Sequence, residues 1–179
     1  MRTFLILALA AAVPAGELSQ PAVSVRSSDG VYVVSARFEV DAPVAVVRAV
    51  LTDYAGIPDF MPDVRKSVVR QRDGRIVLVE QEAVSKVMMF SKTVHMLLEV
   101  TEGERVLSFR DLCGTDFSRY EGSWTLDARG AGTTVSYALT ADPSFSVPSF
   151  MLKRLLGGNA RDTIESLQAE TVRRASRVN

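Results

Sequence analysis

The feature that most constrains this chain is a succession of alternating segments over residues 64–141, with no helical pattern between them. Apolar side chains recur at every second position, most clearly over residues 92–100, as in strands that bury one face. Asp73-Gly74, Glu102-Gly103 and Gly130-Ala131-Gly132 mark turns between successive strands. Strands joined in this way pair antiparallel and form a twisted, curved sheet. The predicted strands span residues 64–71, 75–84, 92–100, 105–111, 117–126 and 133–141.

One strand and two short helices precede this succession. Apolar and polar residues alternate over residues 31–40, which predicts a strand. Pro43 follows at a position suited to the first turn of a helix, and apolar residues then recur at helical spacing up to Leu51. Residues 54–60 form a second short helical segment, which Met61-Pro62 ends.

The chain closes with a long amphipathic helix that begins near Pro148. Gly157-Gly158 lies in its middle, where each glycine costs about 1 kcal/mol relative to alanine. Such a pair indicates a kink, a close approach to the sheet, or space left for another molecule. The predicted apolar stripe of this helix consists of Phe150, Met151, Leu152, Leu155, Leu156, Ala160, Ile164 and Leu167.

These elements predict an α+β fold in which about six or seven antiparallel strands curve around the C-terminal helix. A chain of 179 residues is long enough to bury the core of one such domain. Lys and Arg number 21, as do Asp and Glu, so no net charge attracts nucleic acid, and we expect no nucleic-acid partner.

The N-terminus has the pattern of a secretory signal peptide. Met1-Arg2-Thr3 is short and positively charged, and residues 4–13 are an apolar run too short to span a bilayer. Pro14-Ala15 then provides small residues for cleavage. We expect residues 1–15 to be the signal peptide, 16–30 a polar linker and 31–176 the folded domain, located in the periplasm or secreted. An uncleaved N-terminal anchor is the alternative.

The chain contains one cysteine, Cys113, and one histidine, His95. An intrachain disulfide and a zinc site of the usual Cys/His composition are therefore excluded. The P-loop, the nucleophile elbow and the dinucleotide-binding fingerprint are absent from the sequence. We expect neither a metal site nor a cofactor.

Two adjoining segments resemble the START-like superfamily, also called SRPBCC. Residues 38–47 (FEVDAPVAVV) are similar to its opening. Residues 50–62 (VLTDYAGIPDFMP) are similar to its more specific D-Y-x-x-x-P-x-F-x-P segment, and look most like the coenzyme Q-binding and polyketide cyclase/dehydrase group. The resemblance spans roughly residues 31–172.

The resemblance implies a helix-grip fold, in which a curved antiparallel sheet holds the C-terminal helix with a cavity between them. Members typically bind lipids, quinones, sterols or polyketide-like molecules there, and a minority are enzymes. Because the superfamily has no universal catalytic set, no catalytic residue is carried over to this chain. The predicted signal peptide sets this chain apart from the mitochondrial and cytoplasmic members of the superfamily. It therefore argues against a role with the quinones of the respiratory chain.

The predicted ligand-binding residues are the larger side chains on the inward strand faces and on the helix stripe. Methionine adapts to irregular shapes, and tyrosine or tryptophan adds one polar group to an apolar wall. The alternative is that these residues pack a core without a cavity. The set comprises Phe60, Met61, Met89, Met96, Phe109, Tyr120, Trp124, Tyr137, Met151 and Leu155.

Three polar features are candidate sites of chemistry. His95 falls on the solvent side of its strand and is rejected as a general base. The polar residues around Cys113, which are Arg110, Asp111, Asp116 and Arg119, are better explained as a solvated loop than as a headgroup site. Glu80 and Glu82 would support catalysis only if they pointed inward with raised pKa values.

The sequence favours a protein that binds a hydrophobic small molecule, for transport or sensing, over two alternatives. One alternative is a cyclase or dehydratase acting on a polyketide-like substrate, and the other is an adaptor domain with a closed core. Transient contact with a membrane is compatible with all three. Ligand identity, oligomeric state and pathway are not indicated by the sequence.

Overall fold

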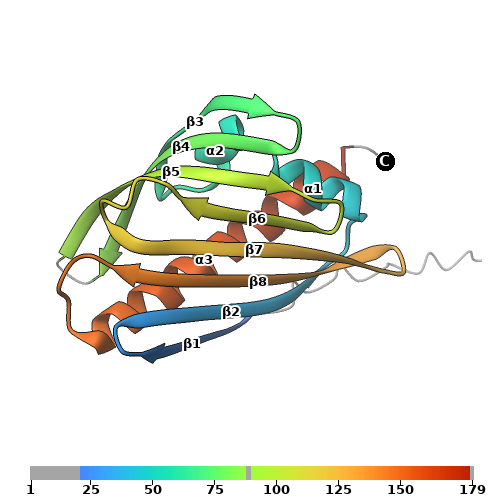
Figure 1. The fold of residues 1–179 in the computed structure, drawn as a ribbon. Coiled ribbons are helices and arrows are strands. Elements are labelled where there is room, and N and C mark those ends of the chain that lie inside the picture. Colours follow the sequence, from blue (N-terminus) through green and yellow to red (C-terminus); the bar gives the residue numbers. More distant parts are fainter. Residues whose placement is uncertain (1–20, 88–89, 178–179) are drawn as a thin grey trace, which may run out of the picture.

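The computed structural model describes residues 21–87 and 90–177, and its eight strands form one antiparallel sheet (Figure 1). The strand order across the sheet is β1-β2-β8-β7-β6-β5-β4-β3. Strands that follow one another in the sequence are paired, except that β2 pairs with β8 rather than with β3. The last strand therefore lies next to the first hairpin, β1-β2. The strands are β1 (Ala22–Ser28), β2 (Val31–Val40), β3 (Val64–Asp73), β4 (Ile76–Val87), β5 (Phe90–Glu102), β6 (Val106–Asp111), β7 (Phe117–Arg129) and β8 (Gly132–Pro143).

The helices follow the predicted order. After β2 come α1 (Val44–Leu51), the short 3-10 helix η1 (Tyr54–Gly56) and α2 (Ile57–Phe60). The long helix α3 (Ser149–Ala175) crosses one face of the sheet and packs against β1, β2 and α1 (Figure 1). The predicted α+β helix-grip fold is therefore confirmed, with eight strands rather than six or seven.

The additional strand, β1, lies in the segment predicted to be a linker. It pairs with β2 through a turn at Asp29-Gly30, where both residues have positive φ. This is the backbone of a tight hairpin turn, and Asp-Gly is one of the residue pairs that favour it. Val23 and Val25 are half-buried against the core, so the strand extends the buried face of the sheet by one more row.

Strand alternation decides which side chains enter the core. Buried residues recur at every second position on β2, β5 and β8, and the buried residues of α3 face them. Phe38, Val34 and Val135 are fully buried, as are Ile164 and Leu167 of α3. The predicted inward faces of these strands are confirmed.

One residue of the predicted helix stripe is exposed. Phe150 lies in the first turn of α3 and is 71% exposed. It precedes Leu152 by two residues, so it lies about 200° around the helix from that buried side chain. The prediction that Phe150 belongs to the buried stripe was wrong for this reason.

Two glycines allow close approach of neighbouring elements. A Cβ on Gly122 of β7 would lie 2.3 Å from the carbonyl oxygen of Ala138 on β8 and 2.6 Å from the ring of Phe109 on β6, so glycine leaves room here for the backbone of β8 and for that ring. A Cβ on Gly157 of α3 would lie 3.2 Å from a methyl group of Val25, which means that α3 approaches β1 closely there. Of the three explanations offered for Gly157-Gly158, close approach to the sheet therefore applies to Gly157.

Among the helices within residues 21–87 and 90–177, none combines the length and the apolar character needed to cross a membrane.

Candidate ligand cavity

A cavity of about 460 Å³ lies between α3 and the strands that it crosses. Its wall includes residues from α1, η1 and α2, from strands β3 to β8, and from the part of α3 up to Ser166. Most of these side chains are apolar, among them Val79, Leu98 and Leu139. The elements that form the wall are those that the sequence pattern predicts to face inward.

Nine of the ten predicted ligand-binding residues lie in the wall of this cavity: Phe60, Met61, Met96, Phe109, Tyr120, Trp124, Tyr137, Met151 and Leu155. The tenth, Met89, lies outside the described residues, as does Met88. The alternative of a core without a cavity does not hold. That these nine side chains contact a ligand stays a prediction.

Aromatic rings line one side of the cavity. The rings of Trp124 and Tyr137 lie 4.2 Å apart between centroids, and those of Phe117 and Tyr120 lie 4.9 Å apart. Phe109 stands 6.0 Å from Tyr120, in the place that Gly122 leaves free. Tilted pairs at these distances are favourable and fix ring orientations. This arrangement, named here the aromatic wall, gives the cavity a rigid apolar surface.

Two tyrosine hydroxyls belong to the aromatic wall. The side chains of Tyr120 and Tyr137 are joined by a hydrogen bond between their hydroxyl groups. Burial raises the pKa of Tyr120 to about 12, and burial likewise raises the pKa of Tyr137 well above its ordinary value. Both hydroxyls are therefore neutral hydrogen-bonding groups at physiological pH.

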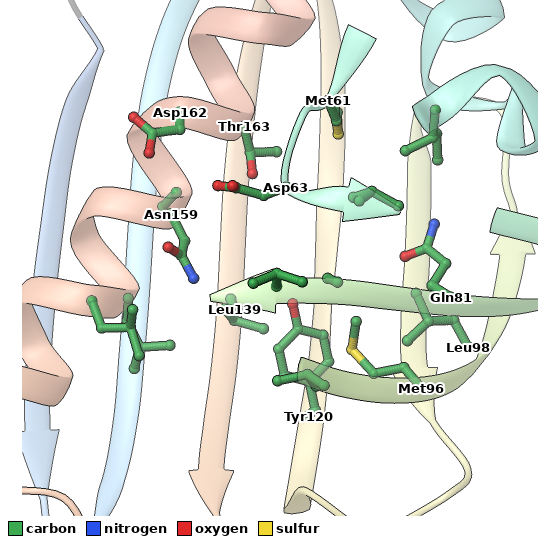
Figure 2. Close-up of a pocket in the computed structure, with 18 of the residues that line it drawn as sticks. Met61, Asp63, Gln81, Met96, Leu98, Tyr120, Leu139, Asn159, Asp162 and Thr163 are labelled. Atoms are coloured by element: carbon green, nitrogen blue, oxygen red, sulfur yellow. The ribbon is translucent and has the colours of Figure 1, made fainter. Parts of the chain in front are cut away.

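Figure 2 shows a polar group of residues across the cavity from the aromatic wall. Asn159 and Thr163 of α3 lie on the side of Asp63, which follows α2, and Asp162 lies next to Thr163 with its carboxylate directed away from Asp63. Asp63 and Asp162 are exposed, so this side of the cavity, named here the polar rim, is open to solvent. The polar rim was not predicted from the sequence, because Asp162 lies off the apolar stripe and Asp63 lies in a connection.

Lys92 of β5 carries the single positive charge among the described wall residues. Its ammonium group lies 2.8 Å from a carboxylate oxygen of Asp116 and 4.6 Å from the ring centroid of Phe145. Burial raises the pKa of Asp116, but the hydrogen bonds from Lys92 and from the His95 backbone N–H hold that pKa below its ordinary value. The charge of Lys92 is thus already neutralised within the protein.

The polar residues around Cys113 have structural partners. Asp111 accepts hydrogen bonds from the backbone N–H groups of Leu97, Cys113 and Gly114, and Asp116 accepts one from the N–H of His95. Arg110 and Arg119 form exposed ion pairs with Glu99 and Glu121. These contacts hold the connection between β6 and β7 against β5, which fits a structural loop rather than a headgroup site.

The carboxylates considered for catalysis do not enter the cavity. Glu80 lies on the outer face of β4, because its neighbours Val79 and Gln81 line the cavity. Hydrogen bonds from Lys66 and then Arg70 lower the pKa of Glu80. His95 is exposed, 3.9 Å from Glu82 on the same outer face. Glu80 and Glu82 both lie on the outer face, and the pKa of Glu80 is lowered rather than raised.

The D-Y-x-x-x-P segment joins the two ends of the fold. The Asp53 carboxylate accepts hydrogen bonds from the backbone N–H of Gly56 and, at 2.6 Å, from Arg174 at the end of α3. Arg174 also donates to Glu170, at 2.6 Å, and its guanidinium lies 5.8 Å from the ring centroid of Phe60. This cluster fastens the C-terminal end of α3 to η1 and α2 beside the cavity.

Tyr54, the second residue of that segment, has a similar role. Its hydroxyl donates a hydrogen bond of 2.8 Å to Glu102, which also pairs with Arg72. Burial, followed by this hydrogen bond, raises the pKa of Tyr54, so the hydroxyl remains a donor. The polar atoms of this segment therefore act in the structure, while the side chains of Ile57 and Phe60 contribute to the cavity wall.

Within the described residues, no three His, Cys, Asp or Glu side chains are grouped so that they could hold a metal ion.

Comparison with solved structures places the fold among lipid-binding proteins and aromatase/cyclases. TTHA0849 from Thermus thermophilus is 25% identical, with a TM-score of 0.69 over 80% of this chain and 99% of that one. The Zhui aromatase/cyclase from Streptomyces sp. R1128 is 18% identical, with a TM-score of 0.70 over 80% and 95%. A STAR-related lipid transfer protein from Xanthomonas axonopodis is 19% identical, with a TM-score of 0.68 over 88% and 96%.

No curated protein is similar enough in sequence to count as a relative. The family described as "Polyketide cyclase / dehydrase and lipid transport" matches residues 32–171, which covers all elements from β2 to most of α3. Lipid-binding proteins and polyketide aromatase/cyclases both occur in this superfamily. The chain belongs to the polyketide cyclase/dehydrase and lipid transport family, within the START-like superfamily.

Proposed function

We propose that the protein binds a small hydrophobic molecule in the cavity under α3, and carries or senses that molecule outside the cytoplasm. The observation that supports this most is the cavity itself, about 460 Å³ in volume with a largely apolar wall. Small-molecule sites commonly enclose about 300–1,000 Å³ and combine apolar walls with a few polar groups. Members of the superfamily bind hydrophobic small molecules in general.

The volume bounds the size of the ligand. An apolar cavity of about 150 Å³ in another protein accepts one benzene molecule. The present cavity, at about 460 Å³, has room for about three such rings or for a single flexible chain of similar volume. The rigid aromatic wall favours a ligand with a flat ring system, because rings stack on tilted or offset partners.

Binding without catalysis is supported by the titratable groups of the wall. Tyr120 and Tyr137 have raised pKa values because they are buried, so neither is a base at neutral pH. The carboxylates of the wall, Asp63 and Asp162, lie in the exposed polar rim rather than at the aromatic wall. A cyclase or dehydratase would require a proton acceptor close to the bound substrate.

The test is to purify the protein gently from an exporting host and to compare native with denaturing mass spectrometry. We expect one copy of an apolar molecule per chain, released on denaturation. A protein that is consistently empty, and that takes up neither fluorescent lipids nor quinones, would contradict the proposal. Conversion of an added polyketide-like ketone would favour the enzyme.

A matched pair of substitutions locates the binding site. Ala83 lines the cavity on β4, so Ala83→Trp should fill part of it and reduce ligand uptake at least tenfold. Ala138 is exposed on β8, so Ala138→Trp makes the same chemical change outside the cavity and should leave uptake unchanged. Equal uptake by both variants would place the ligand elsewhere.

The location outside the cytoplasm is tested separately, by expressing the whole chain and fractionating the cells. We expect the protein in the periplasm or medium, with a mass that corresponds to a chain starting at Gly16. A cytoplasmic protein that retains residues 1–15 would contradict this part of the proposal.

A further inference from the structure

We propose that Tyr120 selects the ligand by donating a hydrogen bond to an uncharged oxygen acceptor, such as an aryl ketone, and that the cavity discriminates against carboxylates. This inference rests on the proposed binding function and names the chemical class of its ligand. Three features of the cavity support it: the hydroxyl pair, the neutralised lysine and the polar rim.

The hydroxyl pair leaves one proton without a protein acceptor. Tyr120 and Tyr137 carry two hydroxyl protons, and the hydrogen bond between them uses one. Within residues 21–87 and 90–177, neither hydroxyl has a further hydrogen-bond partner in the protein. The Tyr120 hydroxyl points into the cavity, toward the space between Met96 and Asn159 (Figure 2). A bound oxygen acceptor would satisfy the remaining donor.

The environment keeps this donor available. Because burial raises the pKa of Tyr120 to about 12, its proton is retained across the physiological range. A hydroxyl that accepts a hydrogen bond becomes a better donor, since chains of hydrogen bonds polarise one another. When Tyr137 is the donor of the bond between the two hydroxyls, the O–H of Tyr120 is the one that remains unused.

The charges around the cavity disfavour an anion. Lys92, the single cation of the described wall, is already paired with Asp116 at 2.8 Å. A carboxylate that entered would lose its water without gaining a cationic partner, which is costly. Asp63 and Asp162 add negative charge at the exposed rim. Fatty acids and aryl carboxylates are therefore poor ligands for this cavity.

Three probes of matching shape test the inference by isothermal titration or by tryptophan fluorescence: acetonaphthone, ethylnaphthalene and naphthoate. They share one ring system and differ in carrying a ketone, no oxygen, or a carboxylate. We expect acetonaphthone to bind about tenfold more tightly than ethylnaphthalene, a difference of about 1.4 kcal/mol. Naphthoate should bind more weakly than both.

Substitution of Tyr120 separates its hydroxyl from its ring. Tyr120→Phe should abolish the preference for acetonaphthone over ethylnaphthalene while the affinity for ethylnaphthalene is kept. Tyr32→Phe is the matched control, because the Tyr32 hydroxyl bonds to Ser149 and does not line this cavity. The control should retain the full preference.

A second variant tests the charge argument without touching the aromatic wall. Asp63→Asn combined with Asp162→Asn changes two exposed side chains, so the fold should be retained. We expect naphthoate binding to become several-fold tighter, with little change for acetonaphthone. This variant remains informative if Tyr120→Phe fails to fold.

The outcomes distinguish this inference from the proposed function. If naphthoate binds as tightly as acetonaphthone, or if Tyr120→Phe keeps the ketone preference, the inference is overturned while the binding function stands. If the wild-type protein binds none of the three probes and carries no ligand on purification, the inference falls together with the proposed function.

Discussion

The two ends of α3 differ in what they do, although they belong to one continuous helix. At the C-terminal end Ile164 and Leu167 are fully buried, and the carboxylate of Glu170, only 5% exposed, is held by Arg173 and Arg174. At the N-terminal end Phe150 is exposed, and Leu155 is half-buried in the cavity wall. The C-terminal end is packed in the core, whereas the N-terminal end combines buried residues such as Leu152 and Leu156 with part of the cavity wall.

This difference shows how a stable fold can keep an internal cavity. Empty space beside a helix lowers its packing energy, since the lining atoms lack partners on one side. The cluster of Asp53, Glu170 and Arg174 and the buried residues of the last turns supply the attachment that the cavity end lacks. The comparison predicts that equivalent substitutions have unequal effects at the two ends.

The largest effect is expected for one substitution made at both ends. Leu167→Ala removes a fully buried side chain from the core and should lower the free energy of unfolding by about 2–5 kcal/mol. Leu155→Ala, in the cavity wall, should lower it by about 1 kcal/mol, because its side chain is not packed on all sides. Urea denaturation measures both, and equal losses would break the comparison.

The ion cluster at the C-terminal end should have the next largest effect, and it should depend on pH. Hydrogen bonds from Arg173, ahead of those from Arg174, lower the pKa of Glu170 from 4.5 to about 2. Ionised Glu170 thus stabilises the fold above pH 4.5, by up to about 3 kcal/mol. This stabilisation is lost as the pH falls from 4.5 to 2.

Glu170→Gln should therefore be destabilised near neutral pH, and its difference from the wild type should shrink as the pH falls toward 2. Urea denaturation at a series of pH values measures this. Glu165→Gln, at an exposed position of the same helix, is the control and should change the unfolding free energy by less than about 0.5 kcal/mol. A pH-independent loss in Glu170→Gln would contradict the role of its charge.

A smaller effect, in the opposite direction, is expected at the glycine pair in the middle of α3. A Cβ on Gly158 would meet no atom within 4 Å, so Gly158→Ala should stabilise the protein by about 0.4–1 kcal/mol. Gly157→Ala should gain less or nothing, because its Cβ would press on Val25 at 3.2 Å. Thermal unfolding compares the two variants. An equal gain in stability would mean that Val25 of β1 moves enough to accommodate the added methyl group.

The smallest effect is expected at the first turn of α3. Phe150→Ala removes a large side chain that is mostly exposed, and should change the unfolding free energy by less than about 0.5 kcal/mol. Chemical denaturation measures the change. A loss comparable with that of Leu167→Ala would show that the N-terminal end is packed after all.

The sheet and most of the cavity wall could be predicted from the sequence, because the alternation of apolar and polar residues is a local property. Met96 and Tyr137 each stand at an inward position of a strand in which buried and less buried residues alternate, so their direction follows from the strand itself. Strand β1 was not predicted, although Asp29-Gly30 is a hairpin signal and Val23 and Val25 alternate with polar residues. The strand is short and rich in serine, which made it resemble a linker.

The sequence by itself determined the order of strands and helices, the inward faces and the family, because turn residues and the two periodicities act over a few neighbouring residues. Only the tertiary structure decided that Asp63 lies beside Thr163 at an open rim, that Glu170 is buried among arginines, and that Phe150 points away. Each of these depends on how α3 lies against elements far from it in the chain. No local pattern encodes that placement, because it arises from packing the whole helix onto a curved sheet.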